Sequence, residues 1–243
     1  MKNAITTIAI AALTTTALAD FTSIDTTTGI NGVNLNLEVS DFMGGFAADG
    51  TSQLAAFVSD FPLVLSNEIH TNLGVSGSGS AYIEVNHNSP TQVSTQGVFN
   101  GVANTFGLQG SAQGGASGTV FFGFTLDSAA DVMMDWALTD SMTNNEDNPG
   151  SMTLYQTDLN GPQLLSIALN GSGEGTFGST ALSLEAGHYV LLAGARLQVN
   201  ADQFDGEVLG TAGFEATFTI VPAPSALAAL GMAGLITTQR RRR

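Results

Sequence analysis

Apolar and polar residues alternate along several stretches of this chain, so that every second side chain is apolar. The clearest examples are the segments Val33 to Val39, Val120 to Leu126, Val132 to Leu138 and Phe214 to Ile220. Neighbouring side chains of a β-strand point to opposite faces of a sheet, and a strand with one buried face therefore shows this period of two. The pattern predicts four half-buried strands, with Trp136 in phase with the buried positions of its strand.

Shorter apolar segments between turn residues predict further strands. They are Ala81 to Val85, Met152 to Leu154, Leu164 to Leu169, Phe177 to Leu184 and His188 to Ala195. The last of these is apolar on both faces, as expected for a central strand. Pairs such as Gly44-Gly45 and Asn170-Gly171 are typical of the turns between strands. Short strands joined by such turns indicate an all-β fold, an antiparallel β-sandwich that is jelly-roll-like.

Two parts of the pattern leave the structure open. Leu54 to Val58 and Leu63 to Leu65 are short apolar runs that fit either a strand or a helix. Asn86 to Gly118 is polar and rich in Gly, Ser, Gln and Asn, and it offers few apolar side chains to bury. We expect this second segment to hold one or two weak edge strands or to form a long loop.

The N-terminus has the three parts of a secretory signal. Lys2 gives a positive start, Ala4 to Leu13 is apolar, and Ala17-Leu18-Ala19 matches an A-x-A cleavage site. Residues 1–19 are therefore predicted to be a signal peptide, with a short signal helix. We expect signal peptidase to cleave between Ala19 and Asp20.

The chain ends in three elements in a fixed order. Pro222-Ala223-Pro224-Ser225 comes first, an apolar run of 11 residues from Ala226 to Ile236 follows, and Arg240 to Arg243 close the chain. The prolines end any preceding strand because neither has a backbone N–H. The apolar run is roughly half of the ~20 residues that span a bilayer. It predicts a short helix in transient contact with a membrane, with the arginines on the cytoplasmic side.

This tail, from Val221 to Arg243, resembles the PEP-CTERM sorting signal. The resemblance implies that an exosortase, a membrane cysteine protease, cleaves the tail, and that the protein goes to the cell surface or extracellular matrix of a Gram-negative-type bacterium. The sorting residues would be Val221, Pro222, Ala223, Pro224, Ser225, Arg240, Arg241, Arg242 and Arg243. Ala223 replaces the Glu that the family usually has between the prolines. The alternatives are an ordinary C-terminal membrane anchor and an apolar tail folded into the body.

Between the two ends lies a body of residues 20–221 with an extreme charge balance. All 21 acidic residues of the chain fall in it, against Arg196 as its one Lys or Arg, so its formal charge is −20. Nucleic acid and anionic lipid need a basic surface, and both are excluded as partners of the body. The chain has no cysteine. An exported protein without disulfides depends on its core alone for stability.

The segment Asp131 to Leu197 resembles the β-sandwich domains that follow secreted bacterial peptidases, and related jelly-roll modules. The resemblance lies in a strand with Val132 and Trp136, in Ser151 to Tyr155, and in a closing pattern of Leu184, Gly187 and Tyr189. It implies a sandwich fold and no particular ligand.

No catalytic constellation is visible in the sequence. His70, His87 and His188 are its only histidines, and no ligand spacing relates them. Neither a G-x-S-x-G elbow nor an H-E-x-x-H motif occurs. We therefore assign no catalytic residue, no cofactor-binding residue and no metal ligand, and we expect the protein not to be an enzyme. An esterase or a glycosidase is the least favoured alternative.

Two acidic clusters have the oxygen ligands that Ca²⁺ prefers. One is Asp140 with Asn144, Asn145, Glu146, Asp147 and Asn148, and the other is Asn200 with Asp202, Asp205 and Glu207. Neither matches the D-x-D-x-D-G loop, and each fits a solvated turn equally well.

The sequence leaves two functions open. The first is an exported, exosortase-processed structural protein of the surface or matrix. The second is a carbohydrate- or calcium-binding module that attaches the cell to extracellular polysaccharide. Tyr82 and Tyr155, more than Trp136, are the aromatic residues expected to face solvent.

Overall fold

The computed structural model describes residues 19–25, 31–142, 150–169, 175–203 and 205–222, and Ala19–Val221 form one compact unit. The expected signal helix and sorting helix lie outside the described residues. Residues 143–149 and the turn at Asn170-Gly171 lie outside them as well. Within the described part the long elements are all strands, and the one helical element is a 3₁₀ turn, η1 (Val58–Asp60). The all-β prediction is confirmed.

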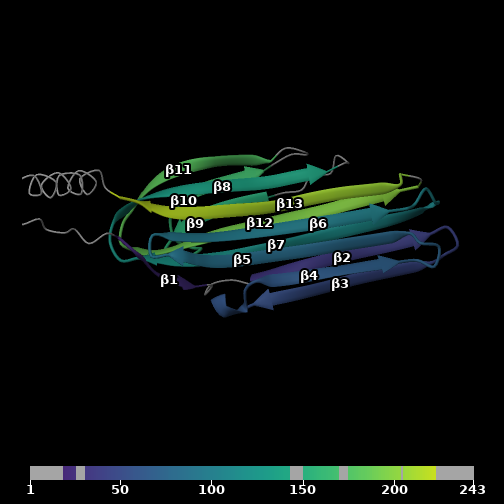
Figure 1. Ribbon diagram of the computed structural model, residues 1–243, viewed down its shortest axis with the longest axis horizontal. Coiled ribbons are helices and arrows are strands. Elements are labelled where there is room, and N and C mark those ends of the chain that lie inside the picture. The colour runs from purple at the N-terminus through teal and green to yellow at the C-terminus, as the bar shows by residue number, and fades with distance from the viewer. Residues whose placement is uncertain (1–18, 26–30, 143–149, 170–174, 204, 223–243) are drawn as a thin grey trace, which may run out of the picture. The chain divides into compact units, whose positions relative to one another are not determined.

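One sheet, sheet A, has seven strands that are antiparallel to their neighbours (Figure 1). Across the sheet, they are β10 (Gln163–Leu169), β9 (Gly150–Gln156), β12 (Gly187–Asp202), β7 (Gly110–Leu126), β2 (Asn31–Asp41) and β3 (Phe46–Ala55), with β1 (Phe21–Asp25) paired to β7 beside β2. The strand β12 lies between β9 and β7, which explains why its sequence is apolar on both faces.

The other sheet, sheet B, has six antiparallel strands. In order they are β11 (Thr176–Leu184), β8 (Ala130–Met142), β13 (Glu207–Val221), β6 (Gln92–Asn104), β5 (Ser76–Ser89) and β4 (Leu63–His70). The ambiguous apolar runs are thus resolved: Leu54 and Ala55 are the last residues of β3, Val58 begins η1, and Leu63 to Leu65 start β4.

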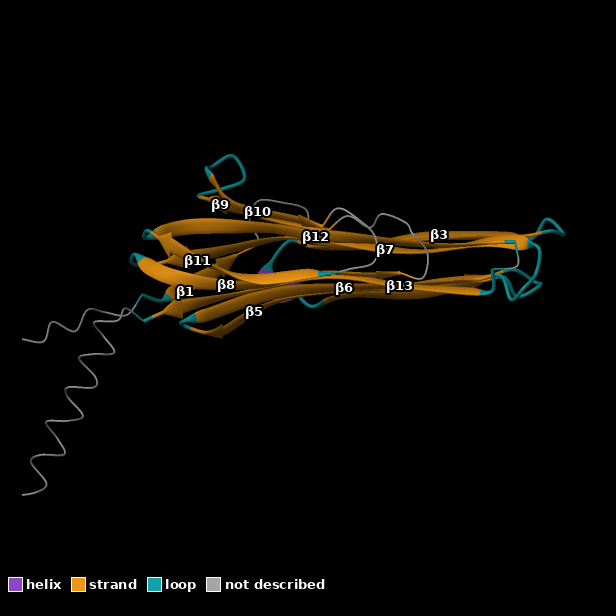
Figure 2. Ribbon diagram, turned by 90° about the horizontal axis from the view of Figure 1, so that it is seen from above, coloured by secondary structure: helices purple, strands orange, loops and turns teal. Residues whose placement is uncertain are grey.

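The two sheets pack face to face and bury one side of each (Figure 2). The predicted alternation is confirmed on β2, where Val33, Leu35, Leu37 and Val39 are at most 2% exposed. Trp136 points toward the core but is only partly buried, and its Nε1 donates to Thr180 Oγ1 at 3.3 Å. Phe177 differs from Leu182 and Leu184 of its strand, because it lies on the outer face and is 83% exposed.

The core contains an aromatic cluster centred on Phe124 of β7. Its ring centroid lies 4.8 Å from that of Phe218 in the opposite sheet, 5.3 Å from that of Phe21 on β1, and 5.5 Å from that of Tyr189 on β12. The Phe21 ring stands edge-on to Phe124, whereas Tyr189 stacks on it. Such pairs contribute about 0.5–1.5 kcal/mol each beyond the area they bury. One side chain thus joins four strands and both sheets.

The prediction of weak edge strands or a long loop at 86–118 is wrong. The segment contains the last residues of β5, the whole of β6 in the interior of sheet B, and the first half of β7. Its inward positions carry many glycines and alanines, so the hydrophobic signal is weak. A Cβ on Gly114 would lie 2.4 Å from the Val102 carbonyl oxygen of the facing sheet. The two backbones approach closely here, and small side chains are what this approach requires.

The two ends of the sandwich are different. We call the end that holds the β5–β6 turn the proximal end. There, the N–H of Phe21 donates to Pro90 O at 2.6 Å and the N–H of Ile220 donates to Thr91 O at 2.9 Å. The first and last strands therefore meet at the same β5–β6 turn. The distal end is formed by the β2–β3, β4–β5, β6–β7 and β12–β13 loops, at the right of Figure 1.

We predict that Phe124→Ala lowers the free energy of unfolding by about 3–5 kcal/mol, because it removes a buried ring and leaves a cavity. The matched control is Phe177→Ala, which removes the same side chain from the outer surface and should change it by less than about 0.5 kcal/mol. Guanidinium unfolding of both variants measures the difference. Equal losses would contradict the central place given to Phe124.

Candidate functional site

The predicted processing residues lie mostly outside the described part of the chain. This holds for Ala17, for the sorting residues Ala223, Pro224 and Ser225, and for Arg240 to Arg243. Val221 is the last residue of β13 and is exposed, as is Pro222 after it. Ala19 is buried against the core.

The residue after the predicted signal cleavage site is held by the β7–β8 loop. The N–H of Asp20 donates to Asp127 Oδ1 at 3.0 Å, and the N–H of Asp127 donates back to Asp20 O at 3.3 Å. Ser128 Oγ donates to the same carboxylate oxygen at 2.9 Å. The hydrogen bond from Asp20, with that from Ser128, lowers the pKa of Asp127 below its ordinary value.

Of the three histidines, His188 takes part in a bridge between strands. Its Nε2 lies 3.0 Å from Asp25 Oδ2 on β1, and its Nδ1 lies 2.8 Å from the Thr157 carbonyl oxygen. Gly123 makes room for the bridge, because a Cβ there would lie 2.1 Å from Asp25 Oδ1. This ion pair or hydrogen bond ties β1 to β12 across β7, and we interpret it as structural. His70 and His87 are exposed on separate parts of sheet B.

Among the described residues, no three His, Asp or Glu side chains gather in a geometry that could hold a metal ion. In the second cluster, Asp205 Oδ2 accepts from the Asp202 N–H at 2.9 Å, and Glu207 Oε2 lies 3.4 Å from Asn104 Nδ2. These acids stabilise the β12–β13 turn. In the first cluster Asp140 is 3% exposed, and its neighbours 144–148 lie outside the described residues.

Tyr82 is on the outer face of sheet B, as expected, but it is tied to a polar network. Its hydroxyl donates to Glu84 Oε2, while Glu84 Oε1 accepts from Asn86 Nδ2 and Gln96 Nε2 at 2.8 Å each. This fixes the ring against the sheet and makes it a poor platform for a ligand. Tyr155 on β9 is half-buried.

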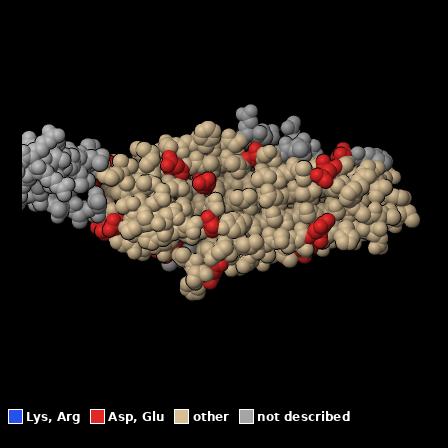
Figure 3. All heavy atoms as spheres, in the orientation of Figure 1, with Lys and Arg blue, Asp and Glu red and all other residues tan. Residues whose placement is uncertain are grey.

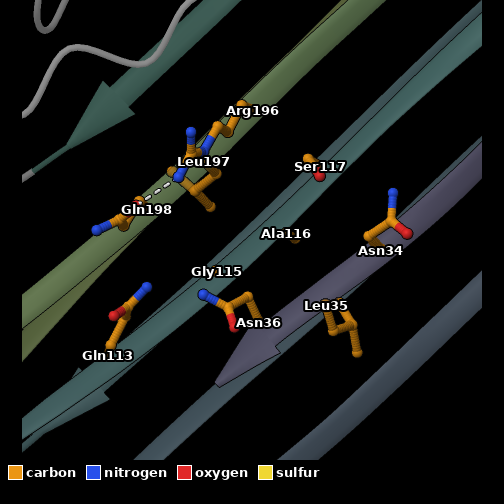
Figure 4. Close-up of a pocket in the computed structure, with 10 residues that line it drawn as sticks. All are labelled: Asn34, Leu35, Asn36, Gln113, Gly115, Ala116, Ser117, Arg196, Leu197 and Gln198. Atoms are coloured by element: carbon orange, nitrogen blue, oxygen red, sulfur yellow. Dashed lines mark hydrogen bonds between the residues drawn. The ribbon is translucent and has the colours of Figure 1, made fainter. Parts of the chain in front are cut away.

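A shallow trough lies on the outer face of sheet A, over β2, β7 and β12 (Figure 4). Gly115 forms its floor because it has no side chain. Amide and hydroxyl groups surround this floor, from Asn34, Asn36, Gln113, Ser117 and Gln198. Arg196 is the one Lys or Arg among the described residues, and its Nη2 donates to Gln198 Oε1 at 2.9 Å. This is the one hydrogen bond drawn among the ten residues of Figure 4.

A second depression lies at the distal end, beside Phe42. Its walls are formed by Ser40, Gln109, Ser111, Asp202 and Gln203. The Phe42 side chain is 57% exposed, and the next residue, Met43, is 73% exposed. The neighbouring β6–β7 loop exposes Phe106, which adopts a left-handed conformation (φ 51°) that is unfavourable for a bulky residue. Sequence reasoning missed this group, because its members come from loops and strands far apart in the chain.

The acidic side chains are spread over the surface rather than gathered (Figure 3). On the face seen there they are separated by wide areas of uncharged residues. Charged residues make up 11% of the chain, against about 25% in typical proteins. Uncharged amides and hydroxyls thus supply most of the polar groups that water contacts on the outer faces.

Comparisons with known proteins do not place the chain in a family. No family model matches it, and no curated protein matches it. Among solved structures, it is similar to the enzymatically active domain of bacteriophage CBA120 tailspike protein 4, at 15% identity and a TM-score of 0.24, over 65% of this chain and 19% of the tailspike chain. It is also similar to a mutant VP2 protein of infectious bursal disease virus, at 11% identity and a TM-score of 0.22, over 96% of this chain and 88% of VP2. Scores this low carry no functional argument. Among the described residues, no helix is long and apolar enough to cross a membrane.

We predict an unusual ionisation for Tyr82. Its hydrogen bond to Glu84 stabilises the protonated phenol and raises the pKa of Tyr82 to about 12, from an ordinary value of 10.0. The stabilisation is complete below pH 10 and is lost as the pH rises toward 12. Ultraviolet titration of the wild-type protein against Tyr82→Phe isolates this residue, and Glu84→Gln should return its pKa toward 10. Ionisation of Tyr82 near pH 10 in the wild type would contradict the network.

Proposed function

We propose that this chain is an exported protein that signal peptidase cuts after Ala19 and an exosortase cuts in the C-terminal tail. The product remains at the cell surface or in the extracellular matrix as a structural component, with no catalysis of its own. Before the second cut, the apolar tail holds the precursor at the membrane. The observation that carries the proposal is the order of elements in the sequence, a cleavable signal before Asp20 and a sorting tail after Val221.

The fold of the body supports this proposal in two respects. Its core is built from strands that begin at Phe21 and end at Val221, so neither cut removes a core strand. The first and last strands also meet at the proximal end, on the β5–β6 turn. The first and last strands, next to which the two predicted processing segments begin, therefore lie at that end.

We also propose the finer fold class, a jelly roll. Consecutive strands from β6 to β9 alternate between the two sheets, and so do β11, β12 and β13. Such crossing between layers is typical of jelly rolls and distinguishes them from sandwiches built of hairpins.

A second candidate function is a carbohydrate-binding module that attaches the cell to extracellular polysaccharide. The uncharged amides and hydroxyls around the trough on sheet A favour it, because such groups pair with sugar hydroxyls. Calcium binding, the other form of this alternative, has no support among the described residues.

We predict that mass spectrometry of the cell-surface fraction finds a form that begins at Asp20 and lacks the arginines of the tail. The matched control replaces Arg240 to Arg243 with serine. This variant should still lose its signal peptide, since that cleavage is independent of the tail, but should keep its C-terminus and stay in the membrane fraction. Wild-type protein that carries intact Arg240 to Arg243 at the surface would contradict exosortase processing.

A further inference from the structure

The Phe42 depression and the Gly115 trough belong to one strip on the outer face of sheet A. Ser111, Gln113, Gly115 and Ser117 are successive outward positions of β7. Ser111 lines the depression, and the other three line the trough. At about 3.3 Å per strand residue, the strip from Ser117 to Ser111 is roughly 20 Å long. It can thus hold an extended chain rather than one small molecule.

The strip offers hydrogen-bonding groups in rows across three strands. The pairing places Asp202 and Ser40 on either side of Ser111, Asn200 and Glu38 on either side of Gln113, and Arg196 and Asn34 on either side of Ser117. Most of these groups are amides or hydroxyls, which both donate and accept hydrogen bonds. At its distal end the strip adds the aromatic ring of Phe42.

The loop that carries Phe42 is held in place before any ligand arrives. Asp41 Oδ1 accepts from the N–H groups of Met43 at 2.9 Å and Gly45 at 2.8 Å, and the Phe42 N–H donates to Gln109 O at 3.0 Å. The hydrogen bond from Gly45, against the opposing effect of burial, lowers the pKa of Asp41, so the carboxylate stays charged. An exposed ring on a fixed loop loses little entropy when it binds a partner.

The ligand must match a surface that is polar along its length and apolar at one point. A pyranose sugar has this character, since its edge carries hydroxyls and its ring face carries C–H groups that pack on an aromatic ring. The charged residues along the strip restrict the class of ligand further. Asp202 and Glu38 flank the strip, and Arg196, at the end far from Phe42, already donates to Gln198. Carboxylated, sulfated or phosphorylated glycans would be repelled.

We propose that the strip from Phe42 to Ser117 binds a chain of uncharged pyranose sugars, with one ring face on Phe42 and the hydroxyls on the amides of β2, β7 and β12. This inference rests on the carbohydrate-binding candidate function and gives it a site and a ligand class. The structural role proposed first does not depend on it.

The test is affinity electrophoresis of the full chain in gels that contain dextran, a β-glucan, a galactomannan or polygalacturonate, with a glycan array beside it. We expect at least one neutral polysaccharide to retard the protein, with little dependence on salt, and polygalacturonate to have no effect. Phe42→Ala should weaken the interaction roughly 3- to 10-fold, the value of one aromatic contact. Gln113→Ala should also weaken it.

The matched control is Phe177→Ala, which removes an even more exposed ring from sheet B and should leave the retardation unchanged. Phe106→Ala tests whether any apolar ring at the distal end suffices, and it too should have no effect. Thermal melts confirm that the variants fold. If a neutral glycan binds wild type and Phe42→Ala equally, carbohydrate binding stands but this site is wrong. Binding to polygalacturonate alone overturns the ligand class, and binding to no glycan overturns both the site and the candidate function.

A separate observation at the proximal end concerns the predicted signal cleavage. The Asp20 nitrogen that lies 3.0 Å from Asp127 Oδ1 is an amide in the precursor. Cleavage after Ala19 turns this nitrogen into an α-ammonium group without moving it. The hydrogen bond from a neutral amide to the carboxylate becomes an ion pair between an ammonium group and the carboxylate, which is stronger.

We infer that Asp127 receives the new N-terminus, so that removal of the signal peptide fastens β1 to the β7–β8 loop. Ser128 Oγ, at 2.9 Å from the same oxygen, helps to orient the carboxylate. The strand that is fastened carries Phe21, which packs on Phe124. This inference rests on the proposed cleavage site and deepens the export proposal.

The test is a double-mutant cycle on mature protein that begins at Asp20, with a free or an acetylated N-terminus, each with Asp127 or with Asp127→Asn. All four forms lack Ala19, so any effect of its loss on the Tm is the same in each and drops out of the comparison. We expect acetylation to lower the Tm by about 1–4 °C when Asp127 is present, the effect of one exposed ion pair, and to have no effect with Asp127→Asn. An equal effect in both backgrounds overturns the inference. Failure of the cleavage itself would appear separately, as surface protein with a different first residue.

Discussion

Contact between the Phe124 ring and the rings of Phe21, Tyr189 and Phe218 ties the two sheets together at the proximal end. The chain has no cysteine to form a disulfide, and a single cation among its described residues. Apolar burial must therefore supply the stability that disulfides give to many exported proteins. Because the first strand contributes Phe21 and the last contributes Phe218, the core strands all lie between the two predicted cuts, and Ala19 is the one described core residue before them.

Local alternation in the sequence predicted much of this fold. Where inward positions carry Val, Leu or Phe, as on β2 and in the second half of β7, the predicted strands and their buried faces are confirmed. It failed where inward positions are Gly or Ala, as on β6 and in the first half of β7, because small residues give no hydrophobic signal. Those residues let the sheets approach closely, and that constraint becomes visible only when the facing sheet is known. The local pattern marked β12 as central, but the interior position of β6 depended on pairing that its own sequence does not indicate.

The candidate site could not have been predicted in the same way. The outward residues of β2, β7 and β12 are spread over more than 160 positions of the chain, and only the strand register makes them neighbours. Their individual types, Asn, Gln and Ser, are ordinary for a solvated face. What distinguishes the strip is the glycine floor, the rows of amides and hydroxyls and the fixed Phe42 loop, and each of these is a property of the assembled sheet. The second acidic cluster shows the converse, since Asp205, close in sequence to Asp202, accepts a hydrogen bond within the β12–β13 turn.

The central claim is that every core strand lies within residues 20–221, and that Ala19 is the one described residue outside this range that packs against the core. Guanidinium unfolding of residues 20–222 beside the full-length chain tests this most directly. The account predicts the same midpoint and the same slope for both, because the slope reports the surface exposed on unfolding. A lower midpoint together with a shallower slope for the shorter chain would contradict it, since the ends would then be part of the folded interior.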